Sequence, residues 1–253
     1  MIIDNIYIIN LKRREDRLFK IEKLFNELGG IFHNYERFDA VDGNTLSLKD
    51  NNLTLKTKYL YDNPTLLMDI KSKGAIGCYY SHLNIWQDAI KNNYNNIIIF
   101  EDDVQTDLTL NEIMDYINSV PNDYDIAYLD YFCMNLNNNI NINDCWNENK
   151  LDTIALTSAY LISNKGIQKL LINAYTIEMQ IDCYLSVYAN IQNDFKRYLA
   201  KKKVFNQGII GFIGFNTDIT NLNSIKCFFY QYMSIKTFSK IILLLIIFFW
   251  FLH

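Results

Sequence analysis

Three consecutive carboxylates, Glu101, Asp102 and Asp103, follow directly after the apolar run at residues 97–100. The polar stretch 92–96 precedes this run, and the pattern predicts a buried strand of an α/β sheet. Adjacent carboxylates repel one another, and each is costly to bury while it is ionised. A divalent cation that prefers oxygen ligands, such as Mg²⁺ or Mn²⁺, would relieve that repulsion. The triplet therefore predicts a metal site at the carboxyl end of the strand, where open α/β sheets bind ligands, although a solvated acidic turn has the same composition.

The segments around the triplet alternate between strand-like and helix-like patterns. Short apolar runs predict further strands at residues 6–9, 31–38, 126–129 and 159–162. Helical spacing of apolar residues predicts helices between residues 14 and 29, at 74–91, at 110–120 and after a cap at Ser163 or Asn164. The first strand, helix and strand form a βαβ unit, which implies a parallel pair with a right-handed crossover. We expect residues 44–73 to form an excursion or lid and the Asn-rich residues 135–149 to form a mobile loop.

Composition limits the number of domains and the kinds of partner. The 253 residues, 50% of them hydrophobic, suffice for one α/β domain, which we place at residues 1–224. A net charge of -4 and a pI near 5.4 argue against a general affinity for nucleic acid. The cysteines are odd in number, widely spaced and without CxxC pairs, so they predict free thiols and neither a disulfide framework nor a zinc site.

The last part of the chain, residues 225–253, forms a hydrophobic tail. Residues 241–252 are an uninterrupted apolar run, preceded by Lys236 and Lys240. A membrane-spanning helix needs about 20 apolar residues, so this run is short for a full span and fits an interfacial anchor better. A buried terminal helix is the alternative, although such a helix would show a polar face. We expect the tail to attach the chain to a membrane on its cytoplasmic side, because the amino terminus shows no secretory signal.

Several segments, taken in order, resemble glycosyltransferase family 25, the group that contains lipooligosaccharide galactosyltransferases and procollagen galactosyltransferases. The most specific of them is residues 73–86, which includes the Ser81-His82 pair. The others lie at residues 8–17, 38–43, 101–104, 124–129, 159–163, 181–182, 205–207 and 217–219. This resemblance implies a GT-A-like α/β fold, with a mixed, mostly parallel sheet flanked by helices. It also implies a nucleotide-sugar donor, usually Mn²⁺, and inversion at the anomeric carbon.

The resemblance gives the acidic triplet a role in metal binding. Asp103 is expected to contact Mn²⁺ or Mg²⁺, while Glu101 or Asp102 contacts the ribose or a water ligand of the metal. Glu101 and Asp103 have the D-x-D spacing of GT-A enzymes, with Glu in the first position. A cation at this place would stabilise the charge that grows on the diphosphate leaving group. The alternative for any one of these carboxylates is a hydrogen-bond acceptor next to the site.

Donor binding is expected in the turn that follows the first strand. The backbone amides of Asn10 and Leu11 and the side chains of Arg13 and Arg17 could hold uracil, ribose or diphosphate. Arginine suits this task because its guanidinium group binds phosphate through two parallel hydrogen bonds.

Two further segments are expected near the donor. Asp39 and Asp42 stand where a base or ribose would be held, although both residue types are also common in turns. Gly74 and Gly77 would let the backbone at the start of a helix approach the donor, and Ser81 lies one turn further on.

Inverting transfer needs a carboxylate that accepts the proton of the acceptor hydroxyl. Asp182 is the first candidate for this base, and it could instead be a metal ligand. Asp130 and Asp218 are the reserves. His82 is expected to have a role in the site but not to bind the metal, although a single helical histidine is more often structural.

The resemblance, together with these residues, implies a metal-dependent hexosyltransferase that moves galactose or glucose from a UDP-sugar to a hydroxyl of a glycan, lipooligosaccharide or glycoprotein. Two other classes remain open. A phosphoester hydrolase could use the same carboxylates to activate water, but the additional His and Asp clusters of two-metal hydrolases are missing from the sequence. A catalytically silent relative could keep the fold as a binding or scaffold protein.

Overall fold

The computed structural model describes residues 1–49, 52–62, 70, 72–133, 139–150, 153–192 and 194–207. The hydrophobic tail at 225–253, the reserve base Asp218 and the segment 217–219 lie outside these described residues. Within the described part of the chain, no helix has the length and apolar character needed to cross a membrane. The expected domain boundary and the expected anchor therefore stay predictions.

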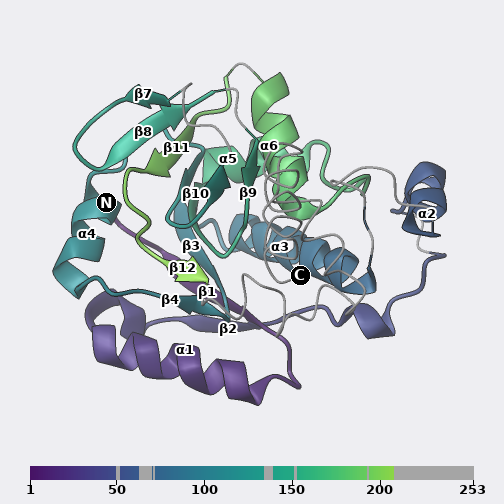
Figure 1. Ribbon diagram of the computed structural model, residues 1–253, viewed down its shortest axis with the longest axis horizontal. Helices are drawn as coiled ribbons and strands as arrows, with labels where there is room; N and C mark the ends of the chain where they lie inside the picture. The colour runs from purple at the N-terminus through teal and green to yellow at the C-terminus, as the bar shows by residue number, and fades with distance from the viewer. Residues whose placement is uncertain are drawn as a thin grey trace, which may run out of the picture.

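A mixed eight-stranded sheet forms the centre of the molecule (Figure 1). In spatial order its strands are β2 (Glu36–Asp39), β1 (Asn5–Asn10), β3 (Asn96–Glu101), β10 (Ala159–Ser163), β5 (Ile126–Tyr128), β11 (Arg197–Ala200), β8 (Trp146–Asn149) and β7 (Asn139–Asn141). The pairings make β10 and β8 run opposite to the other six strands. The expected mostly parallel α/β sheet is therefore confirmed, and it is consistent with a GT-A-like fold.

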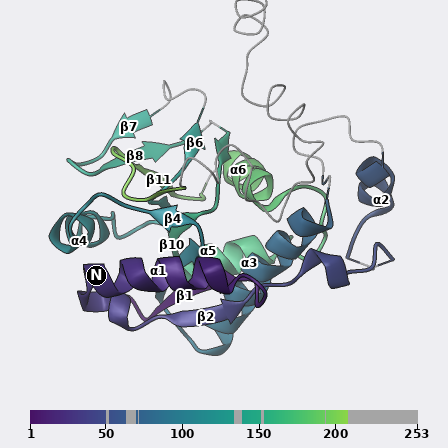
Figure 2. The same ribbon diagram turned by 60° about the horizontal axis from the view of Figure 1, so that its bottom comes forward.

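Helices flank this sheet on both faces. The described helices are α1 (Glu15–Leu28), α2 (Leu55–Asp62), α3 (Lys73–Lys91), α4 (Leu110–Asn118), α5 (Asn164–Leu171) and α6 (Ile181–Ile191), with short 3₁₀ turns at Gly30–His33 and Gly43–Thr45. The helix α2 lies apart from the sheet (Figure 1). Two small two-stranded sheets pair β4 (Val104–Gln105) with β12 (Asn206–Gln207), and β6 (Phe132–Cys133) with β9 (Ile154–Ala155). Figures 1 and 2 show α1 and α4 on one side of the sheet, and α3, α5 and α6 on the other.

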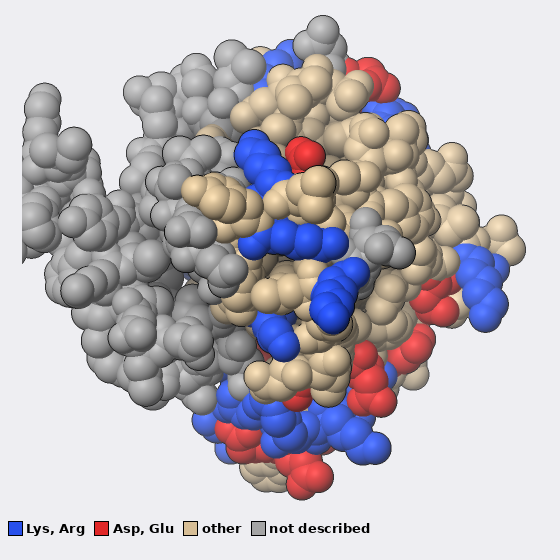
Figure 3. Space-filling model, turned by 90° about the vertical axis from the view of Figure 1, so that its right-hand side faces the viewer, with Lys and Arg blue, Asp and Glu red and all other residues tan. Residues whose placement is uncertain are grey.

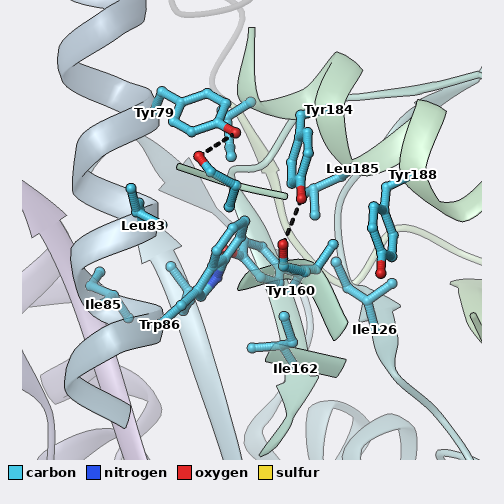
Figure 4. Close-up of a cluster of buried hydrophobic side chains, with 14 of the residues drawn as sticks. Tyr79, Leu83, Ile85, Trp86, Ile126, Tyr160, Ile162, Tyr184, Leu185 and Tyr188 are labelled. Atoms are coloured by element: carbon cyan, nitrogen blue, oxygen red, sulfur yellow. Dashed lines mark hydrogen bonds between the residues drawn. The ribbon is translucent and has the colours of Figure 1, made fainter. Parts of the chain in front are cut away.

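The strand β3 shows how the layers form. Ile97 and Ile99 belong to the core under α3, α5 and α6, whereas Ile98 and Phe100 belong to the core under α1 and α4. Alternate side chains of a strand point to opposite faces, so a strand that is apolar at every position is buried on both. Figure 4 shows the first of these cores, where Trp86 of α3 lies against Tyr160 of β10.

Three expectations about local structure are wrong in part. The strand expected at residues 31–38 is shorter, because Gly29 and Gly30 have φ values of 72° and 57° and lead into a 3₁₀ turn that buries Phe32. The excursion at 44–73 contains the helix α2. The loop expected at 135–149 contains the hairpin β7–β8, whose strand β8 pairs with β11 and buries Trp146.

Candidate functional site

The candidate catalytic and metal-binding residues lie at the carboxyl ends of the central strands. Strands β1 and β3 both end there, at Asn10 and Glu101, because they run parallel and adjacent. The reversed strand β10 begins at the same edge, so the residues that precede it, Thr157 and Ser158, reach the end of β3. The backbone N–H of Glu101 donates to the carbonyl of Ser158 at 2.8 Å. The carboxyl edge of the sheet is therefore built by segments far apart in the sequence.

Glu101 lies at the centre of this edge. Its Oε1 accepts a hydrogen bond from the Thr157 hydroxyl at 2.8 Å and lies 3.5 Å from His82 Nε2. Its Oε2 accepts from Gln207 Nε2 at 3.4 Å. Burial raises the pKa of Glu101, but His82 and the Thr157 hydrogen bond outweigh that effect and hold the pKa below its ordinary value. Glu101 is therefore an ionised carboxylate near neutral pH.

Asp102 and Asp103 have different surroundings although they are neighbours in the sequence. The side chain of Asp102 is buried and accepts from Asn10 Nδ2 at 2.7 Å and from Arg17 Nη1 at 2.8 Å. Asp103 lies 3.7 Å from Arg17 Nη1 and accepts from Gln207 Nε2 at 3.4 Å. Burial and the charge of Glu101 raise the pKa of Asp103 to about 7. Asp102 is thus held in a compact ion pair, while Asp103 carries a charge that is poorly compensated.

Asp182 joins this group from the first turn of α6. Its Oδ1 accepts from the backbone N–H of Cys183 at 2.7 Å, and its Oδ2 lies 3.5 Å from the backbone nitrogen of Leu156. Leu156 adopts a φ of 76°, an unusual conformation for this residue type, directly before the Thr157 that contacts Glu101. Burial and the charge of Glu101 raise the pKa of Asp182. Asp182 is therefore close enough to Glu101 for the charge of Glu101 to affect its pKa.

The helix α3 contributes His82, which is fully buried. Its Nδ1 lies 2.8 Å from the hydroxyl of Tyr160, which also accepts from Trp86 Nε1 at 3.2 Å. Cys78 lies one turn earlier on the same helix. One ligand atom each of Cys78, His82 and Glu101 lies within 4.8 Å of the others, which makes these residues a possible metal-binding group.

The predicted donor-binding glycine and serine of α3 have contacts within the protein itself. A Cβ atom on Gly77 would lie 2.3 Å from the carbonyl oxygen of Val41, so glycine is required for α3 to pack on that turn. The Ser81 hydroxyl donates to the Gly77 carbonyl at 2.8 Å and accepts from the Val41 N–H at 2.9 Å. Gly74 lies in the first turn of the helix, next to Gly43. These contacts give Gly77 and Ser81 a structural reason that needs no donor.

The turns after β1 and β2 meet through Arg13 and Asp42. Arg13 Nε donates to Asp42 Oδ2 at 3.0 Å, and the arginine side chain is 42% exposed. The backbone N–H of Asn44 and the guanidinium of Arg13 hold the pKa of Asp42 below its usual range. Asp39 is exposed and lies 2.9 Å from Arg37 Nη1. The structure therefore joins two segments that the sequence analysis assigned to the donor separately.

Two other expected residues are fixed inside the structure. Asn10 is buried and accepts from Arg37 Nε at 3.0 Å, and its neighbour Leu11 accepts the backbone N–H of Arg14 at 2.8 Å. The reserve base Asp130 is fully buried, accepts from the Ser158 hydroxyl at 2.6 Å and lies 3.1 Å from Lys203 Nζ. Because its charge is balanced by a lysine, Asp130 is a weaker candidate for the base than Asp182.

The model of glycosyltransferase family 25 (LPS biosynthesis protein) matches residues 3–185, which contain the ends of β1 and β3, the helix α3 and Asp182. The chain belongs to glycosyltransferase family 25. This family assignment confirms the resemblance found in the sequence.

Individual members of family 25 match parts of the chain. A Drosophila melanogaster protein named glycosyltransferase 25 family member is 38% identical over 105 residues, 41% of this chain and 16% of that protein. Human procollagen galactosyltransferase 2 is 29% identical over 198 residues, 74% of this chain and 30% of that protein. Human inactive glycosyltransferase 25 family member 3 is 28% identical over 135 residues, 50% of this chain and 21% of that protein. The matched part is thus less than a third of each relative.

Sequence reasoning on this family 25 chain missed four contributors to the site: Cys78, Leu156, Thr157 and Gln207. The cysteine is in the segment that most resembles the family, but cysteine spacing alone gave it no role. Thr157 and Gln207 reach Glu101 only because β10 is reversed and β12 pairs with β4. Their positions are therefore decided by the topology of the sheet.

Charge is distributed unevenly on the face at the right-hand side of Figure 1, where α2 lies. Figure 3 shows separate basic side chains among uncharged residues on this face, and a mixture of acidic and basic side chains at its lower edge.

Proposed function

We propose that this family 25 chain transfers a hexose, galactose or glucose, from a UDP-sugar to a hydroxyl group of a glycan, lipooligosaccharide or glycoprotein. The observation that carries the proposal is the convergence of Glu101, Asp103 and Asp182 on the carboxyl edge of the sheet. Burial, together with the charge of Glu101, raises the pKa of both aspartates. Such an arrangement is unfavourable for stability and is typical of a site that binds a cation or moves a proton.

The donor set suits a hard divalent cation, Mn²⁺ or Mg²⁺. Glu101 and Asp103 supply carboxylate oxygens, and a cation would relieve the poorly compensated charge of Asp103. The bound cation would neutralise negative charge on the departing nucleoside diphosphate. Asp102 is not expected to bind the cation directly, because both of its oxygens already accept hydrogen bonds from Arg17 and Asn10.

Asp182 is the proposed general base. A base must be able to accept a proton near neutral pH, and burial raises the pKa of this carboxylate towards that range. The carboxylate would take the proton of the acceptor hydroxyl while the acceptor oxygen attacks the anomeric carbon from the side opposite to the diphosphate. That in-line geometry gives inversion. Asp182 is held for this task by the backbone N–H of Cys183 at 2.7 Å.

The turn that carries Arg13 is the proposed binding place of the diphosphate. Arg13 is the exposed arginine of this turn, whereas Arg17 is buried against Asp102 and Asp103. The guanidinium group of Arg13 could release Asp42 and bind a phosphate through two parallel hydrogen bonds. The ribose or base would then lie near Asp39 and Asp42.

The hydrolase and the silent scaffold are the competing functions. One relative, human family member 3, is named inactive, so membership of the family does not by itself establish turnover. Incubation with Mn²⁺ and a panel of nucleotide sugars, with and without glycan acceptors, separates the three. Acceptor-dependent release of nucleoside diphosphate supports transfer, cleavage of a phosphoester supports the hydrolase, and no turnover with any donor would support the scaffold.

We also propose that the tail at residues 225–253 attaches the domain 1–224 to a membrane on the cytoplasmic side. The support is the apolar run at 241–252 and the two lysines before it. Residues 1–233 and the full chain should be compared by fractionation with and without lipid vesicles. Binding of the full chain alone supports an anchor, and a full chain that never binds vesicles contradicts it.

A further inference from the structure

Cys78 and His82 lie four residues apart on α3, so their side chains share one face of the helix. Glu101 approaches the same point from the end of β3. The Sγ atom of Cys78, a ring nitrogen of His82 and a carboxylate oxygen of Glu101 lie within 4.8 Å of one another. A thiol, an imidazole and a carboxylate from two different elements are thus brought to one place.

The second observation concerns the unused nitrogen of His82. Nε2 is buried and has no hydrogen-bond partner among the described residues, and it lies 3.5 Å from Glu101 Oε1. A buried polar atom without a partner is unfavourable unless a ligand satisfies it. The Tyr160 hydroxyl lies 2.8 Å from Nδ1. When a metal ion displaces the proton of Nε2, Nδ1–H can donate to this hydroxyl, and the Nε2 lone pair becomes a ligand. Histidines that bind metals usually donate their other N–H in this way.

We propose that Cys78, His82 and Glu101 form a binding site for Zn²⁺, separate in chemistry from the Mn²⁺ or Mg²⁺ site at Glu101 and Asp103. Sulfur and nitrogen ligands favour zinc over manganese or magnesium, which prefer oxygen. Tetrahedral zinc with bonds of about 2.1 Å places a nitrogen and an oxygen ligand about 3.4 Å apart. The separation of 3.5 Å between His82 Nε2 and Glu101 Oε1 matches that spacing.

The charges balance when the ion binds. The Cys78 thiol releases its proton to solvent and becomes a thiolate, so one thiolate and the Glu101 carboxylate neutralise the two positive charges of Zn²⁺. His82 binds as a neutral imidazole. The fourth position is left for water or another oxygen ligand, as in zinc sites with three protein ligands.

Sharing of Glu101 gives the zinc site a consequence for activity. A zinc ion that occupies Glu101 competes with the cation that the proposed sugar transfer requires, so Zn²⁺ should inhibit transfer that is supported by Mn²⁺. This consequence rests on the proposed function, whereas the zinc binding itself does not. Zinc binding without transfer would reject the proposed function alone.

Titration of the full-length protein with Co²⁺ tests the site directly, because Co²⁺ takes the place of Zn²⁺ and absorbs light. We expect the near-ultraviolet band of a cobalt–thiolate bond and the visible bands of tetrahedral cobalt, both lost when Zn²⁺ is added. Cys78→Ser should abolish the thiolate band and weaken Co²⁺ binding by about 100-fold or more. Cys145→Ser is the matched control, because Cys145 is also half-buried but packs in the other core.

Two further variants keep the test decisive if Cys78→Ser folds poorly by circular dichroism. Tyr160→Phe removes only the hydroxyl that orients His82 and should weaken Co²⁺ binding by about 10–100-fold while the thiolate band remains. Asp103→Asn should keep the thiolate band, because Asp103 is not one of the three proposed zinc ligands. Absence of a thiolate band in the wild type, or a band that survives in Cys78→Ser, would overturn the proposal. So would equal Co²⁺ affinity in the wild type and in Tyr160→Phe.

Discussion

The buried carboxylate Asp125 at the start of β5 and the buried carboxylates at the end of β3 lie at opposite ends of parallel strands and differ in how their charge is compensated. Asp125, just before β5, is fully buried, and its Oδ2 accepts from Lys169 Nζ at 2.8 Å and from the Lys196 N–H at 2.7 Å. Lys165 Nζ lies 3.8 Å from its other oxygen. At the end of β3, by contrast, Glu101 raises the pKa of Asp103 to about 7 after burial has already raised it.

This difference distinguishes a carboxylate that stabilises the fold from carboxylates that are available for binding or catalysis. At Asp125 the protein supplies lysines and a backbone N–H, so the buried charge is compensated by the fold itself. At the end of β3, burial and the charge of Glu101 raise the pKa of Asp103 and of Asp182, and a ligand or a proton is needed to compensate these two carboxylates. Substitutions at the first group should therefore affect stability, and substitutions at the second should affect chemistry.

The largest expected effect is at Asp103. Asp103→Asn should reduce sugar transfer by about 10⁴-fold, equivalent to about 5.5 kcal/mol, because the cation loses a charged ligand. Rates with saturating Mn²⁺ and donor measure this, and the unfolding midpoint in urea should not fall. Asp107→Asn is the control, since Asp107 is exposed on the same segment. Wild-type transfer in Asp103→Asn would remove this residue from the site.

The proposed base should give the next largest effect. Asp182→Asn should slow transfer by about 10²–10⁴-fold and leave Mn²⁺ and nucleoside diphosphate binding unchanged. Single-turnover rates and calorimetric titrations distinguish the two properties. The exposed Glu178, four residues earlier, offers the matched Glu178→Gln control. Loss of Mn²⁺ binding in Asp182→Asn would make this carboxylate a metal ligand instead.

Asp125 should show the opposite pattern. Asp125→Asn should lower the free energy of unfolding by about 3–5 kcal/mol, because it leaves the Lys169 ammonium without its buried partner. Urea unfolding measures the loss, and transfer per folded molecule should be unchanged. Asp123→Asn, at an exposed neighbour, should change stability far less. A variant of Asp125 that keeps its stability but loses transfer would contradict the comparison.

The raised pKa of Asp103 should also make the stability of the protein depend on pH. In protein treated with a chelator, Asp103 has a pKa of about 7, against an ordinary value of 3.8. The folded state therefore binds more protons than the unfolded state between those values, and the free energy of unfolding falls as pH rises through that window. Asp103→Asn should lack this fall, and its advantage over the wild type should reach at most about 4 kcal/mol above pH 7. Urea unfolding at pH 4, 5.5 and 7.5 checks the slope, and parallel curves for both proteins would refute it.

The smallest expected effect is at the donor turn. Arg13→Ala should weaken nucleoside diphosphate binding by about 1–3 kcal/mol, because a charge-assisted hydrogen bond to phosphate is lost. Calorimetry measures the affinity, with Lys12→Ala as a control for loss of one exposed positive charge in the same turn. Equal affinities in both variants and in the wild type would place the diphosphate elsewhere.

The sequence by itself determined the elements and the order of the motifs. Apolar runs located β1, β3, β5 and β10, and helical periodicity located α1, α3, α4 and α5, because burial on a sheet or helix face requires those spacings. Hairpin β7–β8 was missed, since its polar, Asn-rich strands are stabilised by pairing with β11 and not by an apolar pattern. The acidic triplet was visible, but its three members looked equivalent.

Only the tertiary structure distinguished these three carboxylates. Arg17 and Asn10 reach Asp102 from another helix and strand, so local sequence cannot show that this carboxylate has two hydrogen-bond donors. The reversed strand β10 brings Thr157 to Glu101, and α3 brings Cys78 and His82 to the same point. Electrostatic energies depend on distance and burial, and both are set by contacts between segments up to about a hundred residues apart.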